Sequence, residues 1–96
     1  MTAAHVNALM DDARAVAQYA AAWNLDLFTV STTEFDVKAQ CGNVDHARRL
    51  AAGFNLHHED VSQHDKPDGT WVHVRWSDPS SPLVVVVASR AEQVAS

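Results

Sequence analysis

The stretch Lys66-Pro-Asp-Gly-Thr70-Trp-Val-His-Val-Arg-Trp76 joins a tight turn to a strand. Pro67 sets the first central dihedral angle of a type I turn, and Gly69 takes the positive φ that follows. From Thr70 to Trp76 apolar and polar side chains alternate, as in a strand with one buried face. The stretch therefore predicts a hairpin in which residues 56–64 run antiparallel to residues 70–76.

The register of this hairpin decides which side chains share a face. We expect Gly69 to form a bulge, so that Lys66 pairs with Thr70 and Gln63 pairs with His73. The apolar side of the second strand, Val72, Val74 and Trp76, would then lie on the face of Asp60 and Ser62. The opposite face, away from the helices, would carry the candidate partner-binding residues Trp71, His73, Arg75, Val61 and Glu59. Tryptophan and arginine are enriched in binding hot spots, although a tryptophan here can equally cover the hairpin.

Two helices are predicted before the hairpin. In the first, residues 3–23, one stripe carries Val6, Leu9, Met10, Ala13, Val16, Ala17, Ala20 and Trp23 at steps of three and four. Asn43 is a suitable N-cap for a second helix over residues 44–54. Its inward side chains would be Val44, Ala47, Leu50, Ala51 and Phe54.

Three further strands are expected. Residues 25–31 form one, and residues 34–41 form another whose inward side chains would be Phe35, Val37, Ala39 and Cys41. The run from Leu83 to Ala88 is apolar on both faces between Val84 and Val87, which is typical of a central strand. If one of those faces lacks a helix, a second copy of the chain could cover it in a homodimer.

The segments 21–25 and 52–56 match in chemistry, and both place an aromatic residue, an Asn and a Leu at the end of a helix. An Asn suits the left-handed C′ position there, with the Leu packing back on the last turn. The chain is thus two helix-strand-strand units, residues 3–41 and 43–76, followed by a strand and a short polar tail, residues 89–96. We expect one α+β domain over residues 1–96, of order α-β-β-α-β-β-β, with both helices on one face of a mostly antiparallel sheet of about five strands. This order is that of a permuted ferredoxin-like split motif.

Residues 55–65 contain three histidines and three carboxylates. On a strand, His58 and His64 lie on one face about 20 Å apart, and His57 lies on the other. A zinc ion needs three or four ligands at about 2 Å, so a solvated edge strand is favoured over a metal site. A pH-responsive surface is a third reading. The alternative metal site would use His57, His58, His64 and His73.

Composition narrows the function classes. Twelve Asp and Glu against seven Lys and Arg give a formal charge of −5, which argues against direct nucleic-acid binding. No segment has the length of a membrane span or a signal peptide, and the single cysteine agrees with a reducing compartment, so we expect a cytoplasmic protein that binds no membrane. Cys41 is expected to be a buried structural thiol, and no catalytic or cofactor motif is present.

These patterns predict a small non-enzymatic protein without a cofactor that binds another protein through its sheet face. The partner is unidentified, and a homodimer is possible. The size and acidity suit an accessory or regulatory protein of a bacterial phage or mobile element. One alternative is a divalent-metal-binding domain or metal-dependent hydrolase that uses the histidines. Another is an acidic inhibitor that mimics nucleic acid.

Overall fold

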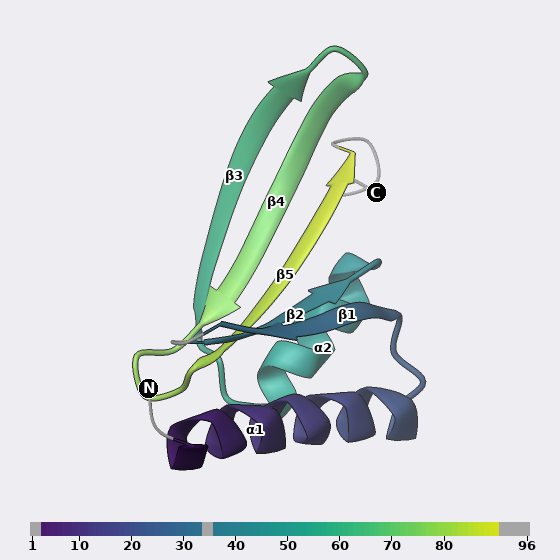
Figure 1. Ribbon diagram of the computed structural model, residues 1–96. Coiled ribbons are helices and arrows are strands. Elements are labelled where there is room, and N and C mark those ends of the chain that lie inside the picture. Colours follow the sequence, from purple (N-terminus) through teal and green to yellow (C-terminus); the bar gives the residue numbers. More distant parts are fainter. Residues whose placement is uncertain (1–2, 34–35, 91–96) are drawn as a thin grey trace.

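The computed structural model describes residues 3–33 and 36–90 and contains two helices and one five-stranded sheet (Figure 1). The elements are α1 (Ala3–Ala22), β1 (Leu27–Thr32), β2 (Val37–Cys41), α2 (Val44–Gly53), β3 (His58–Lys66), β4 (Gly69–Ser77) and β5 (Leu83–Arg90). The sheet order is β1-β2-β5-β4-β3, and only the β2–β5 pair is parallel. Both helices lie on the same face of the sheet. The predicted α+β class and element order are therefore confirmed.

The two helices end in the same way, as the repeated sequence predicts. Asn24 and Asn55 have φ values of 53° and 58°, in the left-handed region. The amide of the following residue, Leu25 or Leu56, donates to the carbonyl five positions back, at 2.8 and 3.0 Å. This is the Schellman arrangement, which satisfies carbonyl groups left over at a helix end. Each cap turns the chain toward the hairpin that follows.

The core lies between the helices and the inner face of the sheet. Strand β5 occupies the centre of the sheet, between β2 and β4, which the doubly apolar run from Val84 to Val87 predicts. Val85 and Val87 are fully buried under α2. The predicted inward positions of β2 are confirmed for Val37, Ala39 and Cys41, while the prediction for Phe35 falls outside the described residues. The remaining large core side chains are Leu9, Val16, Leu50, Leu56, Val72, Val74, Trp76 and Leu83.

The predicted inner stripe of α1 is too wide. Val6, Met10 and Trp23 keep 38%, 50% and 52% of their surface exposed, and Ala17 is exposed as well. The reason is position: α1 packs on β1 and β2 at one side of the sheet, so only a narrow strip of the helix meets the core. The buried strip consists of Leu9, Val16 and Ala20.

The predicted hairpin register is wrong by one residue. Lys66 pairs with Gly69 across a two-residue turn, Ser62 pairs with His73, and Gly69 belongs to the ladder with a φ of 132°. Because side chains alternate with a period of two, a shift of one residue moves every side chain of β3 to the other face. Asp60 and Ser62 thus lie on the face away from the helices.

Side-chain pairs across the hairpin fit this register. Val61 lies opposite Val74, so the only large apolar side chain of β3 meets an apolar neighbour. The indole nitrogen of Trp76 donates to Glu59 Oε1 at 2.9 Å. Val61 and Glu59 therefore do not belong to the candidate partner-binding face, and Val61 keeps 61% of its surface exposed on the helix side. Strand β3 is an edge strand, as its polarity predicts, and every residue in it is exposed.

Candidate functional site

The sheet face opposite the helices is called the open face here, because no helix of the described residues covers it (Figure 1). Register places alternate side chains of each strand on it. Of the candidate residues, Trp71, His73 and Arg75 lie on this face, as predicted. Its side chains from β2, β3, β4 and β5 are Lys38, Gln40, His58, Asp60, Ser62, His64, Lys66, Trp71, His73, Arg75, Ser77, Val84, Val86, Ala88 and Arg90.

Cationic side chains are concentrated on the strands of the open face. Within these four strands it carries four cationic side chains, Lys38, Lys66, Arg75 and Arg90, and one carboxylate, Asp60. Beyond the strand ends, Asp68 lies beside Arg90, and Asp36 and Asp78 line a separate pocket with Arg75. The chain as a whole has a formal charge of −5. More than half of its seven Lys and Arg residues are thus gathered on one sheet face, whereas most of the acidic side chains lie elsewhere.

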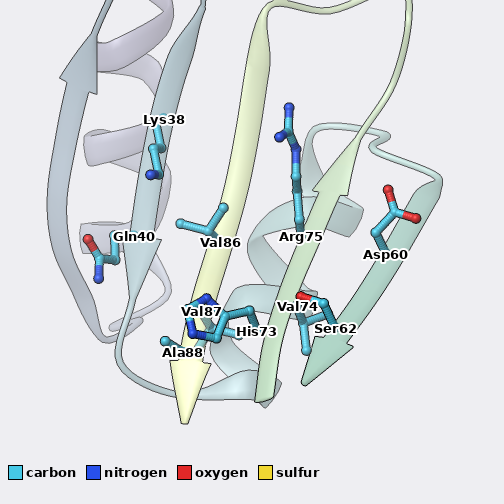
Figure 2. A pocket seen from close by; sticks show the side chains of 10 residues that line it. All are labelled: Lys38, Gln40, Asp60, Ser62, His73, Val74, Arg75, Val86, Val87 and Ala88. Carbon is cyan, nitrogen blue, oxygen red and sulfur yellow. The ribbon is translucent and has the colours of Figure 1, made fainter. Parts of the chain in front are cut away.

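The middle of the open face is hollowed. Figure 2 shows the hollow, which has a volume of about 320 Å³ and follows β5 between β2 and β4. Lys38 and Arg75 stand on the strands that flank β5, and Val86 lies between them. The hollow is lined by Lys38, Gln40, Asp60, Ser62, His73, Val74, Arg75, Val86, Val87 and Ala88. Its lining combines cations, hydrogen-bonding groups and an apolar floor, which is the usual composition of a binding surface.

Arg75 and Lys38 have no carboxylate partner within 4 Å among the described residues. Asp60 lies directly opposite Arg75 in the ladder, but its Oδ2 atom is 3.2 Å from Nε2 of His58 instead. Both cations are on exposed residues. The guanidinium of Arg75 therefore keeps its forked set of donors for a group from outside the chain.

Trp71 is engaged within the hairpin. Its indole nitrogen donates to Asp68 Oδ1 at 3.1 Å. The Lys66 ammonium and the Arg90 guanidinium lie 5.8 and 5.6 Å from its ring centroid, within the range of cation–π attraction. The Oδ2 atom of Asp68 also lies 3.9 Å from the Nη2 atom of Arg90. Trp71 thus covers the turn end of the hairpin, and within residues 3–33 and 36–90 the cations that remain without a partner are the two at the hollow, Lys38 and Arg75.

The corrected register brings two histidines together. The ring centroids of His64 and His73 are 4.5 Å apart, and Ser62 Oγ lies 3.2 Å from His64 Nε2. The expectation that His73 has no histidine neighbour is therefore wrong. The Nε2 atom of His73 is buried and has no hydrogen-bond partner in the described part of the chain. Burial, His64 and Lys66, in that order, lower the pKa of His73.

The four histidines of the alternative metal site do not converge. His58 pairs with Ser77, at the opposite end of β3 from His64. His57 precedes the strand and lines a different hollow beside α2. Within residues 3–33 and 36–90, no group of three or more His, Cys, Asp or Glu side chains has the geometry to hold a metal ion. Of these four histidines, only His64 and His73 lie side by side.

Cys41 is buried in the core, as predicted. Burial and, to a lesser extent, the nearby Asp26 carboxylate raise the pKa of its thiol to about 11. The nucleophilic form of cysteine is the thiolate, so at neutral pH this side chain is an unreactive thiol. Cys41 acts here as a small apolar core residue.

The alternation of β2 already predicts a polar face with Lys38 and Gln40, but these residues were not candidates for the site. They join it because β5, which is last in the sequence, inserts beside β2. The local sequence pattern does not indicate which strand becomes the neighbour of β2.

Comparison of the chain with protein-family models, curated protein sequences and solved structures finds no match. Neither helix of the described part is long and apolar enough to cross a membrane.

Proposed function

We propose that this chain is a non-enzymatic protein-binding module, and that the open face of the sheet is its interface. The observation that carries the proposal is the pair of unpartnered cations over the hollow. Lys38 and Arg75 face solvent beside the half-buried Val86 and Ala88. Charged and apolar groups that are held together on rigid strands, and that have no partner among the described residues, are suited to a partner that supplies both kinds of contact.

The charge of the open face bears on the identity of the partner. A homodimer that packs two open faces together would bring Lys38 and Arg75 of one copy, which have no partner among the described residues, onto the same surface as those of the other copy. Juxtaposed like charges disfavour an interface by several kcal/mol. The proposal is therefore a different protein as partner, with the homodimer as the competing outcome. A regulatory role in a phage or mobile element is compatible with this proposal.

Photo-crosslinking from two adjacent residues tests the proposal. Ser62 and Gln63 are both exposed on β3, and they point to opposite faces of the sheet. A photoreactive phenylalanine derivative is placed at either position in the full chain, in cells of its source. We expect a covalent adduct with another protein from position 62 and none from position 63. Adducts of equal yield from both positions, or an adduct from position 63 alone, would refute the open face as the interface.

The mass of the adduct separates the two kinds of partner. The chain has a mass of 10.5 kDa, so a homodimer gives an adduct of twice that value. An adduct of any other mass identifies a different protein, which mass spectrometry of the excised band then names. A homodimer crosslinked from position 62 would support the interface and contradict the argument from like charge.

A further inference from the structure

We propose that the hollow binds carboxylates, and that its occupant is an acidic, extended segment of the partner protein. Lys38 and Arg75 are the residues that would hold the carboxylates. This inference rests on the proposed function, because it names the chemistry of the partner for the same face. It goes beyond that proposal by assigning two positions in the partner to acidic side chains.

The spacing of the two cations fits an extended segment. Lys38 and Arg75 stand on strands that are separated by β5, and they pair with Val84 and Val86, two residues apart along it, so their backbones lie about 12 Å apart. Alternate residues of an extended chain project on the same side at intervals of about 7 Å. Lysine, arginine and glutamate side chains are long enough to bridge the difference between the separation of the two backbones and the interval of about 7 Å in the partner. Two acidic residues at positions i and i+2 of the partner can therefore reach both cations at once.

The chemistry of the two cations favours carboxylates. An arginine guanidinium pairs with a carboxylate through two parallel hydrogen bonds, and such charge-assisted bonds are about twice as strong as neutral ones. Arg75 has this capacity free, because Asp60 turns to His58. A lysine ammonium acts as a point charge beside it. The hollow thus offers one directional and one non-directional site for negative charge.

The rest of the lining fits a polypeptide better than a nucleic acid. Gln40 and Ser62 can both donate and accept, Asp60 can accept from a backbone N–H, and Val86 and Ala88 supply an apolar floor. A peptide offers donors, acceptors and apolar side chains together. Phosphates only accept hydrogen bonds and have no donor for Asp60, whereas a peptide offers backbone N–H groups to it. Two free cations are also few for a surface that binds phosphates.

Titration of the whole, isotope-labelled chain with defined peptides tests the inference. The probe is an acetylated and amidated octapeptide that alternates glutamate with threonine. Its control replaces each glutamate with glutamine, which has the same shape without the charge. A thymidine oligonucleotide with an equal number of charges is the third probe. Amide chemical shifts in ¹⁵N–¹H correlation spectra report both the affinity and the location of binding.

We expect the glutamate peptide to shift amides of β2, β4 and β5 around the hollow, and to bind at least about tenfold more tightly than the glutamine peptide. The affinity should fall as salt is raised, because exposed charges are screened within about 10 Å at 0.1 M. Shifts confined to the helix side, or an absence of shifts at millimolar peptide, would overturn the inference. Tighter binding of the oligonucleotide would overturn it in favour of nucleic acid.

Charge-matched variants assign the effect to the two cations. Lys38→Gln and Arg75→Gln should each weaken the glutamate peptide about tenfold. Arg14→Gln is the control, because it removes the same charge from the surface of α1, where Arg14 pairs with Asp11. It should change the affinity less than twofold. An equal effect of all three variants would show a general charge effect and overturn the site. Wild-type-like correlation spectra of the variants confirm that they fold.

The two proposals fail in different ways. If the glutamate and glutamine peptides bind the open face equally well, the carboxylate site is wrong, whereas an open-face interface stands. If crosslinking from position 63 equals that from position 62, the interface itself is wrong, whatever the peptides do. A partner crosslinked at position 62 whose contact segment has no acidic residue would also overturn the carboxylate site alone.

Discussion

Gly53 in the last turn of α2 is expected to resist replacement by alanine, although alanine is the better helix former. A Cβ atom at this position would lie 2.4 Å from Cζ and 2.5 Å from the hydroxyl oxygen of Tyr19, on α1. Favourable carbon contacts occur at about 3.5 to 4.0 Å, so the tyrosine ring would have to move by roughly 1 Å. The ring is held by its neighbours, since its centroid lies 5.4 Å from that of Phe54 and 6.1 Å from that of Trp23.

Two opposing contributions set the change in the free energy of unfolding that Gly53→Ala causes. Replacing glycine by alanine in a helix stabilises it by about 0.5 to 1 kcal/mol. Forcing an extra carbon into a packed contact typically costs about 1 to 3 kcal/mol. The overpacking term is the larger one, so Gly53→Ala should lower the free energy of unfolding by about 1 kcal/mol. The sign is thus opposite to the one that helix propensity alone gives.

A double-mutant cycle isolates the contact. Tyr19→Ala removes the ring, and in that background Gly53→Ala should raise the free energy of unfolding by about 0.5 kcal/mol, because only the propensity term remains. Urea unfolding followed by tryptophan fluorescence measures all four proteins. If Gly53→Ala stabilises the protein equally in both backgrounds, the close approach of the two helices at this glycine is wrong.

Three further predictions follow from the hairpin, from His73 and from the N-cap of α2. Val61 and Val74 are paired across the hairpin, so cysteines at both positions should form a disulfide under mild oxidation and stabilise the fold by about 3 kcal/mol. Cysteines replacing Val61 and Arg75 should not form one. Mass spectrometry of the oxidised proteins checks the register. The pKa of His73 is lower in the folded than in the unfolded state, so the unfolded state takes up its proton first and stability falls as the pH drops below about 6.5. In urea unfolding at pH 7.5 and pH 5, His73→Gln should therefore lose less stability than the wild type, and an equal loss would refute this role. Asn43→Ala should lower the unfolding free energy by about 1 kcal/mol, because the Asn43 side chain accepts from two amides of the first helical turn; an unchanged urea midpoint would show that the cap contributes nothing.

Local sequence signals predicted the elements because each depends on neighbouring residues alone. Asn43 accepts the amides that begin α2, and Asn24 and Asn55 take the left-handed conformation that ends the helices. These positions are set by short-range sterics and hydrogen bonding, which the residue type largely specifies. The alternation of β2 likewise predicts its buried face.

The hairpin register shows where such signals fail. A proline and a glycine around one turn are compatible both with a bulge at Gly69 and with a two-residue turn, and the two differ by one residue. The choice is made by contacts across the strands, such as Val61 with Val74 and Trp76 with Glu59. Those pairs are known only once the strands are aligned. The error moved Val61 and Glu59 into the candidate site and left Asp60 and Ser62 out of it.

The sequence by itself determined the number, type and order of the elements and the buried side of β2 and β4, because propensity, capping and side-chain period act within a few residues. Only the tertiary structure decided that β5 inserts between β2 and β4 and so brings Lys38 and Arg75 to one hollow. These residues are far apart in the chain, and their approach depends on burying the apolar faces of all five strands at once. The pattern of residues within one strand therefore cannot predict which strands become neighbours.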